Sequence, residues 1–152
     1  MTNNDVLRHL RHILNVNDSK LIEIAALDGC EILEDEIQAY LCQDDEDGYE
    51  ECPDEVLAHF LNGMIFYKRG RNPDLPEPKL AQSERRITNN IVLKKTRVAF
   101  ALKDTDIVAK IEKSGLRVTK AEVNAFFRSP DHRNYRECLD QFLRNFFKGL
   151  SL

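Results

Sequence analysis

Apolar residues recur three and four positions apart along most of the chain, which is the spacing of amphipathic α-helices. The pattern predicts a first helix that opens at Asn4, a good N-cap residue, and a second that opens at Asp18. Gly29 suits the left-handed position that follows a helix end, so we expect the second helix to stop there. The apolar stripe of the first helix consists of Val6, Leu7, Leu10, Ile13 and Leu14.

The pattern then repeats. Displacing the chain by 86 positions without a gap aligns residues 1–66 with residues 87–152, and 17 of the 66 aligned positions are identical. About four identities are expected by chance at average composition. The sequence is therefore a tandem duplication. The identities include Thr2/Thr88, Asn3/Asn89, Asn4/Asn90, Asp18/Asp104, Gly29/Gly115, Glu36/Glu122, Cys52/Cys138 and Gly63/Gly149.

Each copy contains two further helices. The third opens at Thr119 in the second copy, where Glu122 completes a capping box, whereas Leu33 in the first copy leaves that box half lost. The fourth opens at Cys52-Pro53, with proline at the first helical position. Its apolar stripe consists of Val56, Leu57, Phe60, Leu61, Met64 and Ile65, matched in the second copy by Phe142, Leu143, Phe146, Phe147 and Leu150.

These elements predict an all-α fold of two tandem homologous four-helix repeats. Residues 1–69 form an acidic repeat, residues 70–86 a proline-rich strap and linker, and residues 87–152 a basic repeat. The prolines of the strap favour an extended segment over a helix. A unit of about 65 residues is only marginally stable alone, so we expect the repeats to share a core and to pack about a pseudo-two-fold axis.

The 152 residues carry a net charge of −4, which is ordinary for a globular protein, but the charge is divided unevenly. Residues 1–66 hold 16 acidic and 3 basic residues, a net of −13, and residues 67–152 hold 10 acidic and 19 basic residues, a net of +9. Three interpretations stay open. The opposite charges attract the two copies to each other, the basic half binds an anionic partner such as nucleic acid, or the acidic half binds a basic protein.

The basic charge gathers at the end of the strap and on the first helix of the second copy. Its members there are Arg85, Arg86, Lys94, Lys95 and Arg97. Their spread suits contact with phosphates better than base reading. The second and third helices fit a helix-turn-helix only loosely, since the apolar positions Ile37 and Tyr40 come about two residues later than that motif requires. The third helix of the second copy offers only Lys120, Asn124 and Arg128 as base-reading residue types.

A second set of polar residues recurs in both copies although no helix cap requires it. The set consists of Arg11, Arg97, Tyr49, Tyr135, Glu51 and Glu137. We expect a buried arginine to pair with a glutamate and a tyrosine and so to tie the first helix to the loop before the fourth. Such networks are more often structural than catalytic.

The sequence predicts no metal, no cofactor and no catalytic residue. The acidic loop that begins at Gln43 has Gly48 at the sixth position of a calcium loop, but it lacks the first ligand and the bidentate glutamate at position twelve. His9 and His12 lack a third ligand. The cysteines lack the spacing of zinc ribbons or thioredoxin motifs. Cys52 and Cys138 share the cap of the fourth helix, where a helix N-terminus can lower a thiol pKa, but a small capping residue is the better account.

The apolar stretch around Leu57–Tyr67 is interrupted by polar residues, so we expect no membrane span. The start of the chain has no basic or apolar leader segment, and the four cysteines are typical of reduced thiols. We therefore expect a cytoplasmic protein.

Several segments resemble the YehS-like bacterial proteins, which are tandem copies of a domain of unknown function. The segments are Asn3–Arg8, Gly48-Tyr49, Cys52-Pro53-Asp54, Phe60–Ile65 and Lys68-Arg69-Gly70. The resemblance covers nearly the whole chain and implies a bacterial cytoplasmic protein built from two repeats. It brings no activity and no functional residue with it.

The favoured prediction is a non-enzymatic interaction or regulatory module with an unknown protein partner. The alternative is a nucleic-acid-binding protein that acts through the basic second repeat. An enzyme with a site between the repeats is a third possibility, because pockets form at domain interfaces. The sequence leaves the oligomeric state open.

Overall fold

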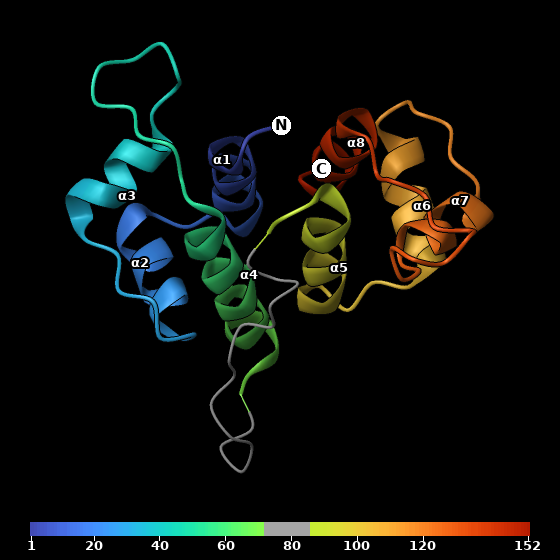
Figure 1. Cartoon of the computed structure of the whole chain (residues 1–152), viewed down its shortest axis with the longest axis horizontal. Helices are drawn as coiled ribbons and strands as arrows, with labels where there is room; N and C mark the ends of the chain where they lie inside the picture. The colour runs from blue at the N-terminus through green and yellow to red at the C-terminus, as the bar shows by residue number, and fades with distance from the viewer. Residues whose placement is uncertain (72–85) are drawn as a thin grey trace. The chain divides into compact units, whose positions relative to one another are not determined.

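The computed structural model describes residues 1–71 and 86–152, and the regular structure within these ranges is entirely α-helical (Figure 1). The chain divides into two compact units, Met1–Ile87 and Thr88–Leu152, with four helices described in each. The predicted all-α fold of two four-helix repeats is confirmed. The helices of the first unit are α1 (Asn3–Leu14), α2 (Asp18–Ala26), α3 (Glu34–Leu41) and α4 (Asp54–Arg69). Those of the second unit are α5 (Asn89–Ala99), α6 (Asp104–Lys113), α7 (Lys120–Phe126) and α8 (Asp140–Leu150).

The first helix of each unit begins earlier than the sequence predicts. Thr2 and Thr88 are the N-caps, and their hydroxyl oxygens accept hydrogen bonds from the backbone N–H groups three residues later, at 3.1 and 3.2 Å. The prediction that Asn4 and Asn90 cap these helices is wrong. Both asparagines lie inside the first helical turn. Their side chains do not cap the helix and instead form hydrogen bonds with distant segments of the chain.

The second and third helices follow the sequence rules closely. Gly29 and Gly115 have φ values of +79° and +100°, which confirms the left-handed turn expected after the second helix. Thr119 and Glu122 form the predicted capping box. In the first unit Glu36 accepts a hydrogen bond from the backbone of Leu33 at 2.9 Å, while Leu33 offers no side-chain cap, so half of the box is lost as predicted.

The fourth helix begins one residue after the predicted start. Pro53 has extended backbone and occupies the N-cap position of α4 instead of the first helical position. The apolar stripe of the fourth helix is largely buried in both units, and in α4 Leu57, Phe60, Leu61 and Met64 are at 1% exposure or less. The predicted pseudo-two-fold packing of the repeats stays a prediction.

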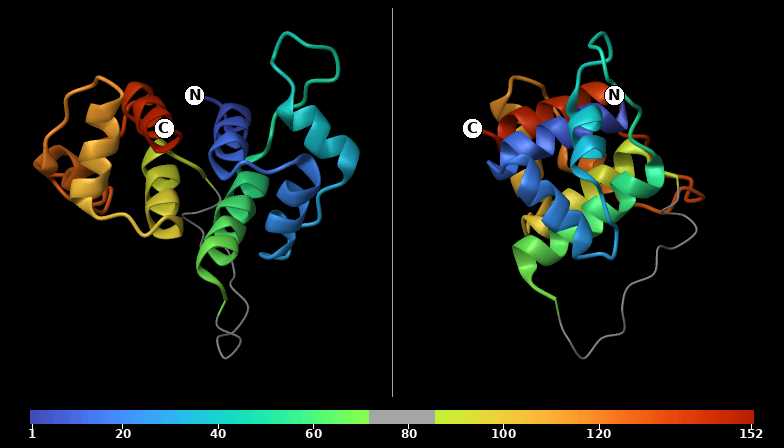
Figure 2. Two further views of the ribbon diagram at one scale, coloured as in Figure 1. Left: turned by 180° about the vertical axis from the view of Figure 1, so that it is seen from behind. Right: turned by 90° about the vertical axis from the view of Figure 1, so that its left-hand side faces the viewer.

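Within each unit the second and fourth helices are the main packing partners (Figure 2). They approach so closely that a Cβ atom added at Gly63 of α4 would lie 1.9 Å from the carbonyl oxygen of Ile24 in α2. A Cβ atom at Gly149 of α8 would lie at the same distance from the carbonyl oxygen of Lys110 in α6. Glycine at this position therefore sets the helix–helix distance in both units.

Most of the predicted strap, together with Arg85, falls within residues 72–85 and so lies outside the described residues. Among those that are described, no helix is long and apolar enough to cross a membrane.

Candidate functional site

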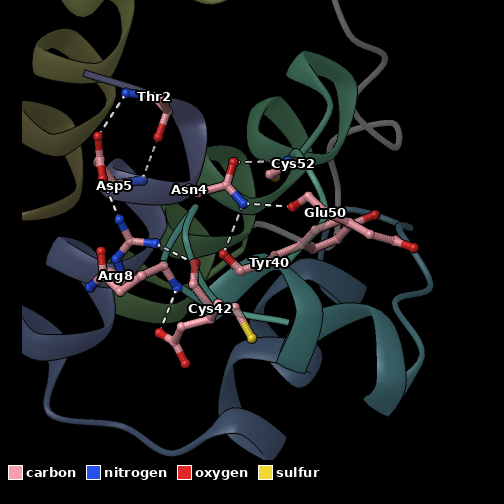
Figure 3. A network of polar contacts seen from close by, with 10 residues as sticks. Thr2, Asn4, Asp5, Arg8, Tyr40, Cys42, Glu50 and Cys52 are labelled. Carbon is pink, nitrogen blue, oxygen red and sulfur yellow. Dashed lines mark hydrogen bonds and ion pairs between the residues drawn. The ribbon is translucent and has the colours of Figure 1, made fainter. Parts of the chain in front are cut away.

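Asn4 joins three segments of the first unit through its carboxamide (Figure 3). Its Nδ2 donates hydrogen bonds to the backbone oxygens of Tyr40, at 2.9 Å, and Glu50, at 2.8 Å. Its Oδ1 accepts a hydrogen bond from the backbone N–H of Cys52 at 3.0 Å. Asn4 is 1% exposed, so these bonds are shielded from water. The side chain thus clamps the segment that precedes α4 against the end of α3.

The same clamp recurs in the second unit. Asn90 donates to the backbone oxygens of Phe126, at 3.0 Å, and Arg136, at 2.9 Å, and accepts from the N–H of Cys138 at 2.9 Å. We call the three bonds of Asn4, and the three of Asn90, the asparagine clamp. Because every partner is a backbone group, the clamp fixes the path of the chain independently of the side chains that the loop carries.

A neighbouring asparagine reinforces each clamp. Asn3 donates to the backbone oxygen of Cys52 at 2.9 Å and to Oδ1 of Asp54 at 2.6 Å. Asn89 makes the equivalent two bonds in the second unit, at 2.9 and 2.7 Å. The start of the fourth helix is thereby tied to the start of the first helix in both units.

The clamped loops have the same internal form. The N–H of Glu50 bonds to the carbonyl oxygen of Ala39 in α3 at 3.3 Å, and the N–H of Arg136 bonds to that of Ala125 in α7 at 3.2 Å. A four-residue turn ends at the tyrosine in both loops, where the tyrosine N–H bonds to the carbonyl oxygen of Glu46 or of its aligned residue His132. The two loops therefore present their side chains on matching frames.

In the second unit, side chains from the third helix and the following loop form one face. This basic face consists of Ala121, Glu122, Ala125, Arg133, Tyr135 and Arg136. The residues that align with them in the first unit are Asp35, Glu36, Ala39, Asp47, Tyr49 and Glu50, and we call this set the acidic face. The basic face, together with Asn134, lines an open cleft of about 400 Å³.

The two faces differ mainly in the sign of their charge. Asp47 aligns with Arg133 and Glu50 aligns with Arg136, and all four side chains are exposed. Both faces retain the glutamate of the capping box, Glu36 in the first unit and Glu122 in the second. On the basic face, Oε2 of Glu122 lies 3.5 Å from Nη1 of Arg136. Since 56% of the Arg136 side chain is exposed, that ion pair leaves much of the guanidinium open to solvent.

The arginines of the expected polar network make different contacts from those predicted. Arg11 pairs with Asp18 at 3.0 Å and Arg97 pairs with Asp104 at 2.8 Å, so each ties the first helix to the start of the second. These arginines therefore bind the start of the second helix and do not form the expected contact with the loop before the fourth helix. Arg97 also lies over the ring of Phe127 at 4.5 Å, a geometry that favours a cation–π interaction.

The tyrosines and glutamates of that set lie in the clamped loops. Tyr49 and Tyr135 are half-buried, while Glu51 and Glu137 are exposed. Partial burial and then the neighbouring glutamate raise the pKa of both phenols, so both stay neutral at physiological pH. Each tyrosine therefore supplies an aromatic body and a hydroxyl to its face.

The described members of the predicted basic surface differ in their exposure and in their contacts. Lys94 is exposed on α5, and Arg86 is exposed ahead of that helix. Lys95 is half-buried, and Arg97 is held by Asp104 and by the carbonyl oxygen of Leu102. Arg97 thus stabilises the second unit, and Arg86 and Lys94 are the described members best placed to meet an anion.

Cys52 and Cys138 are structural residues and not activated thiols. Both are buried immediately before the N-cap of the fourth helix. Burial, together with nearby acidic groups, raises the pKa of each thiol to about 12. Burial therefore shifts both thiol pKa values upward, opposite to the lowering considered for a thiol at a helix N-terminus.

A buried polar cluster in the first unit escapes the sequence prediction. Asp28, whose side chain is 1% exposed, lies 2.9 Å from Nδ1 of His59 and accepts a hydrogen bond from Asn62 at 3.1 Å. In the second unit the aligned residues are Ser114 and Asn145, which form a hydrogen bond of 2.8 Å between neutral groups. The sequence carries no particular signal for this cluster, because the repeats differ at most of the aligned positions.

In the described part of the chain, no three histidine, cysteine or acidic side chains are grouped so that they could hold a metal ion. The loop from Gln43 to Tyr49 closes on itself instead, since the Glu46 side chain accepts a hydrogen bond from the Gln43 N–H at 2.8 Å.

Comparison with known proteins places both units in one family. A family model described as "Protein of unknown function (DUF1456)" matches residues 3–70 and again residues 89–152. "Uncharacterized protein YehS" of Escherichia coli (strain K12) is 48% identical over 151 residues, which cover 99% of this chain and 95% of that protein. No solved structure matches the chain.

Proposed function

The chain belongs to the DUF1456 family of proteins of unknown function, and we propose that it is a non-enzymatic interaction module with two binding faces of opposite charge. The charge reversal at Asp47/Arg133 and Glu50/Arg136 is the observation that carries this proposal. It occurs on loops whose backbones are held by the same clamp. A shared frame with reversed charge supports recognition of two partner surfaces of opposite sign.

The composition of each face also supports binding in place of catalysis. A half-buried tyrosine lies between two exposed charges in each loop, and tyrosine and arginine are enriched at the centres of protein interfaces. The cleft on the basic face is lined in part by the small side chains of Ala121 and Ala125. An extended acidic segment of a partner protein fits such a cleft better than a compact small molecule, because the cleft is open.

The proposal is tested with the full chain and two labelled peptide probes, polyglutamate and polylysine. We expect polyglutamate to bind at low salt and to lose affinity at least tenfold in Arg133→Glu/Arg136→Glu. Polylysine should lose affinity likewise in Asp47→Arg/Glu50→Arg. Both affinities should fall with salt, because exposed charges are screened over about 10 Å at 0.1 M.

A matched control separates the faces from net charge. Lys113→Glu/Lys148→Glu changes the net charge as much as the substitutions on the basic face, but at exposed positions of α6 and α8. It should leave polyglutamate affinity within a factor of about two, since long-range charge affects steering more than local contacts. Equal losses in the control and the face variant would contradict a specific face.

Nucleic-acid binding through the second unit is the other candidate. Residues 88–152 hold 13 basic and 7 acidic residues, a net of +6, and Arg86 and Lys94 are exposed. Fluorescence anisotropy with labelled single- and double-stranded oligonucleotides tests it. Arg86→Glu/Lys94→Glu should weaken binding equally for all sequences and flatten the salt dependence. If the wild-type protein retains no oligonucleotide at low salt, this candidate is excluded.

A further inference from the structure

We infer that the acidic face of one copy of this chain binds the basic face of a second copy, so that the faces proposed above recognise each other between molecules. This inference rests on the proposed function and names its partner. It begins from the matching frames. The clamp, the turn and the bond from the loop to the third helix are the same in both units, so the backbones of the two faces are anchored at equivalent positions.

Two surfaces of the same shape can meet about a two-fold axis, as they do in the interfaces of symmetric dimers. In such an arrangement, a residue on one surface meets a different residue of the matching surface. Asp47 of one copy would then lie opposite Arg136 of the other, and Glu50 opposite Arg133. Two acidic faces would repel each other in this geometry, as would two basic ones, whereas one of each sign attract.

Three of the five charge reversals between aligned positions lie at or beside the faces. Asp47/Arg133 and Glu50/Arg136 flank the tyrosine on either side, and Glu34/Lys120 lies at the start of the adjoining helix. The other two, Lys20/Asp106 and Glu31/Arg117, lie outside the faces. Tyr49 and Tyr135 are unchanged between the faces. Both surfaces thus retain the aromatic centre of an interface and differ in the charges around it.

Every chain carries one face of each sign, so each copy can bind a second copy through either face. A pair of chains that makes both contacts gains apparent affinity beyond that of one face. Because the charges are exposed, the association is expected to be salt-sensitive and reversible.

The test measures the mass of the full-length protein by sedimentation velocity, from micromolar to millimolar concentration. We expect wild-type protein to form dimers at low salt and to dissociate at high salt. Asp47→Arg/Glu50→Arg has two basic faces and should be monomeric, and Arg133→Asp/Arg136→Glu has two acidic faces and should also be monomeric. An equimolar mixture of the two variants should form a mixed dimer, because each supplies the charge that the other lacks.

The mixture guards against misfolding, since recovered dimer shows that both variants keep the binding surface. The Lys113→Glu/Lys148→Glu control should dimerise like the wild type. Wild-type protein that stays monomeric at low salt throughout the concentration range would overturn the inference, and so would variants that stay monomeric when mixed. If either result accompanies face-specific peptide binding, the self-association fails while the proposed function stands. If the peptides fail as well, both fail.

Discussion

Replacing Asn4 with alanine tests whether the asparagine clamp holds the first unit together. The substitution removes three hydrogen bonds at 2.8–3.0 Å and leaves their backbone partners behind. The carbonyl of Tyr40 and the N–H of Cys52 belong to buried residues, at 6% and 4% exposure, so water cannot easily replace the lost partner. Glu50 is exposed, and its carbonyl can be rehydrated.

The expected cost follows from these differences. Leaving a buried polar backbone group without a partner costs about 1–3 kcal/mol, and losing an exposed hydrogen bond costs about 0.5–1.5 kcal/mol. With two buried partners and one exposed partner, Asn4→Ala should therefore destabilise the first unit by about 2.5–7.5 kcal/mol. That is a large part of the stability of a small domain, which is about 0.05–0.15 kcal/mol per residue.

Urea unfolding of the full-length protein measures the loss, and hydrogen exchange locates it. The backbone amide of Cys52 should lose protection in Asn4→Ala, while its counterpart Cys138 keeps it. Asn17→Ala is the matched control, because Asn17 caps α2 through one hydrogen bond at 2.9 Å and should cost about 1 kcal/mol. Equal destabilisation by the two substitutions would refute the reasoning about the clamp.

Three further predictions concern stability. Gly63→Ala should destabilise the protein by about 1–3 kcal/mol in urea unfolding, because the new methyl group collides with the backbone of α2; a stabilised variant, as helix propensity alone predicts, would contradict this. Cys52 and Cys138 keep their protons to about pH 12 when folded but ionise near pH 9 when unfolded, so stability should fall between these pH values. The slope is about 1.4 kcal/mol per pH unit and thiol, and Cys52→Ala/Cys138→Ala should flatten it; an unchanged slope speaks against the assignment. His59→Ala should cost about 2 kcal/mol in thermal unfolding by removing a partner of the buried Asp28 carboxylate, and Asp28→Ser/His59→Asn, which installs the neutral pair of the second unit, should recover most of it. A double variant less stable than His59→Ala would show that the pair cannot be exchanged.

Local rules predicted the features of this fold that depend on neighbouring residues. The helices, the left-handed glycines and the capping box at Thr119 each follow from residues within a few positions of one another. The role of Asn4 was missed because asparagine is also a good N-cap, and its real partners lie 36 to 48 positions away. The cluster of Asp28 and His59, 31 positions apart, was invisible for the same reason.

The sequence predicted the division of charge but not its placement. Net charge showed that the halves differ in sign, and the run of basic residues before and within α5 predicted a binding surface there. Two of the five charge reversals lie elsewhere, beside Tyr49 and Tyr135, in the loops that the structure joins to the third helix of each unit. Arg97 shows the opposite error, since a residue counted as surface charge is held by an aspartate and an aromatic ring.

The asparagine clamp explains how a duplicated domain can change its charge so far without losing its shape. Because Asn4 and Asn90 bind backbone atoms alone, a substitution of loop side chains leaves their hydrogen bonds intact. The positions flanking the tyrosines are therefore open to change, whereas the clamp, the caps Thr2 and Thr88 of the first helices and the glycine at the helix crossing are not. Duplication of such a domain yields two surfaces of one shape, and reversing a few charges on one of them is enough to make the pair complementary. A binding face and its partner can thus arise within a single chain, with no change to the frame that holds either.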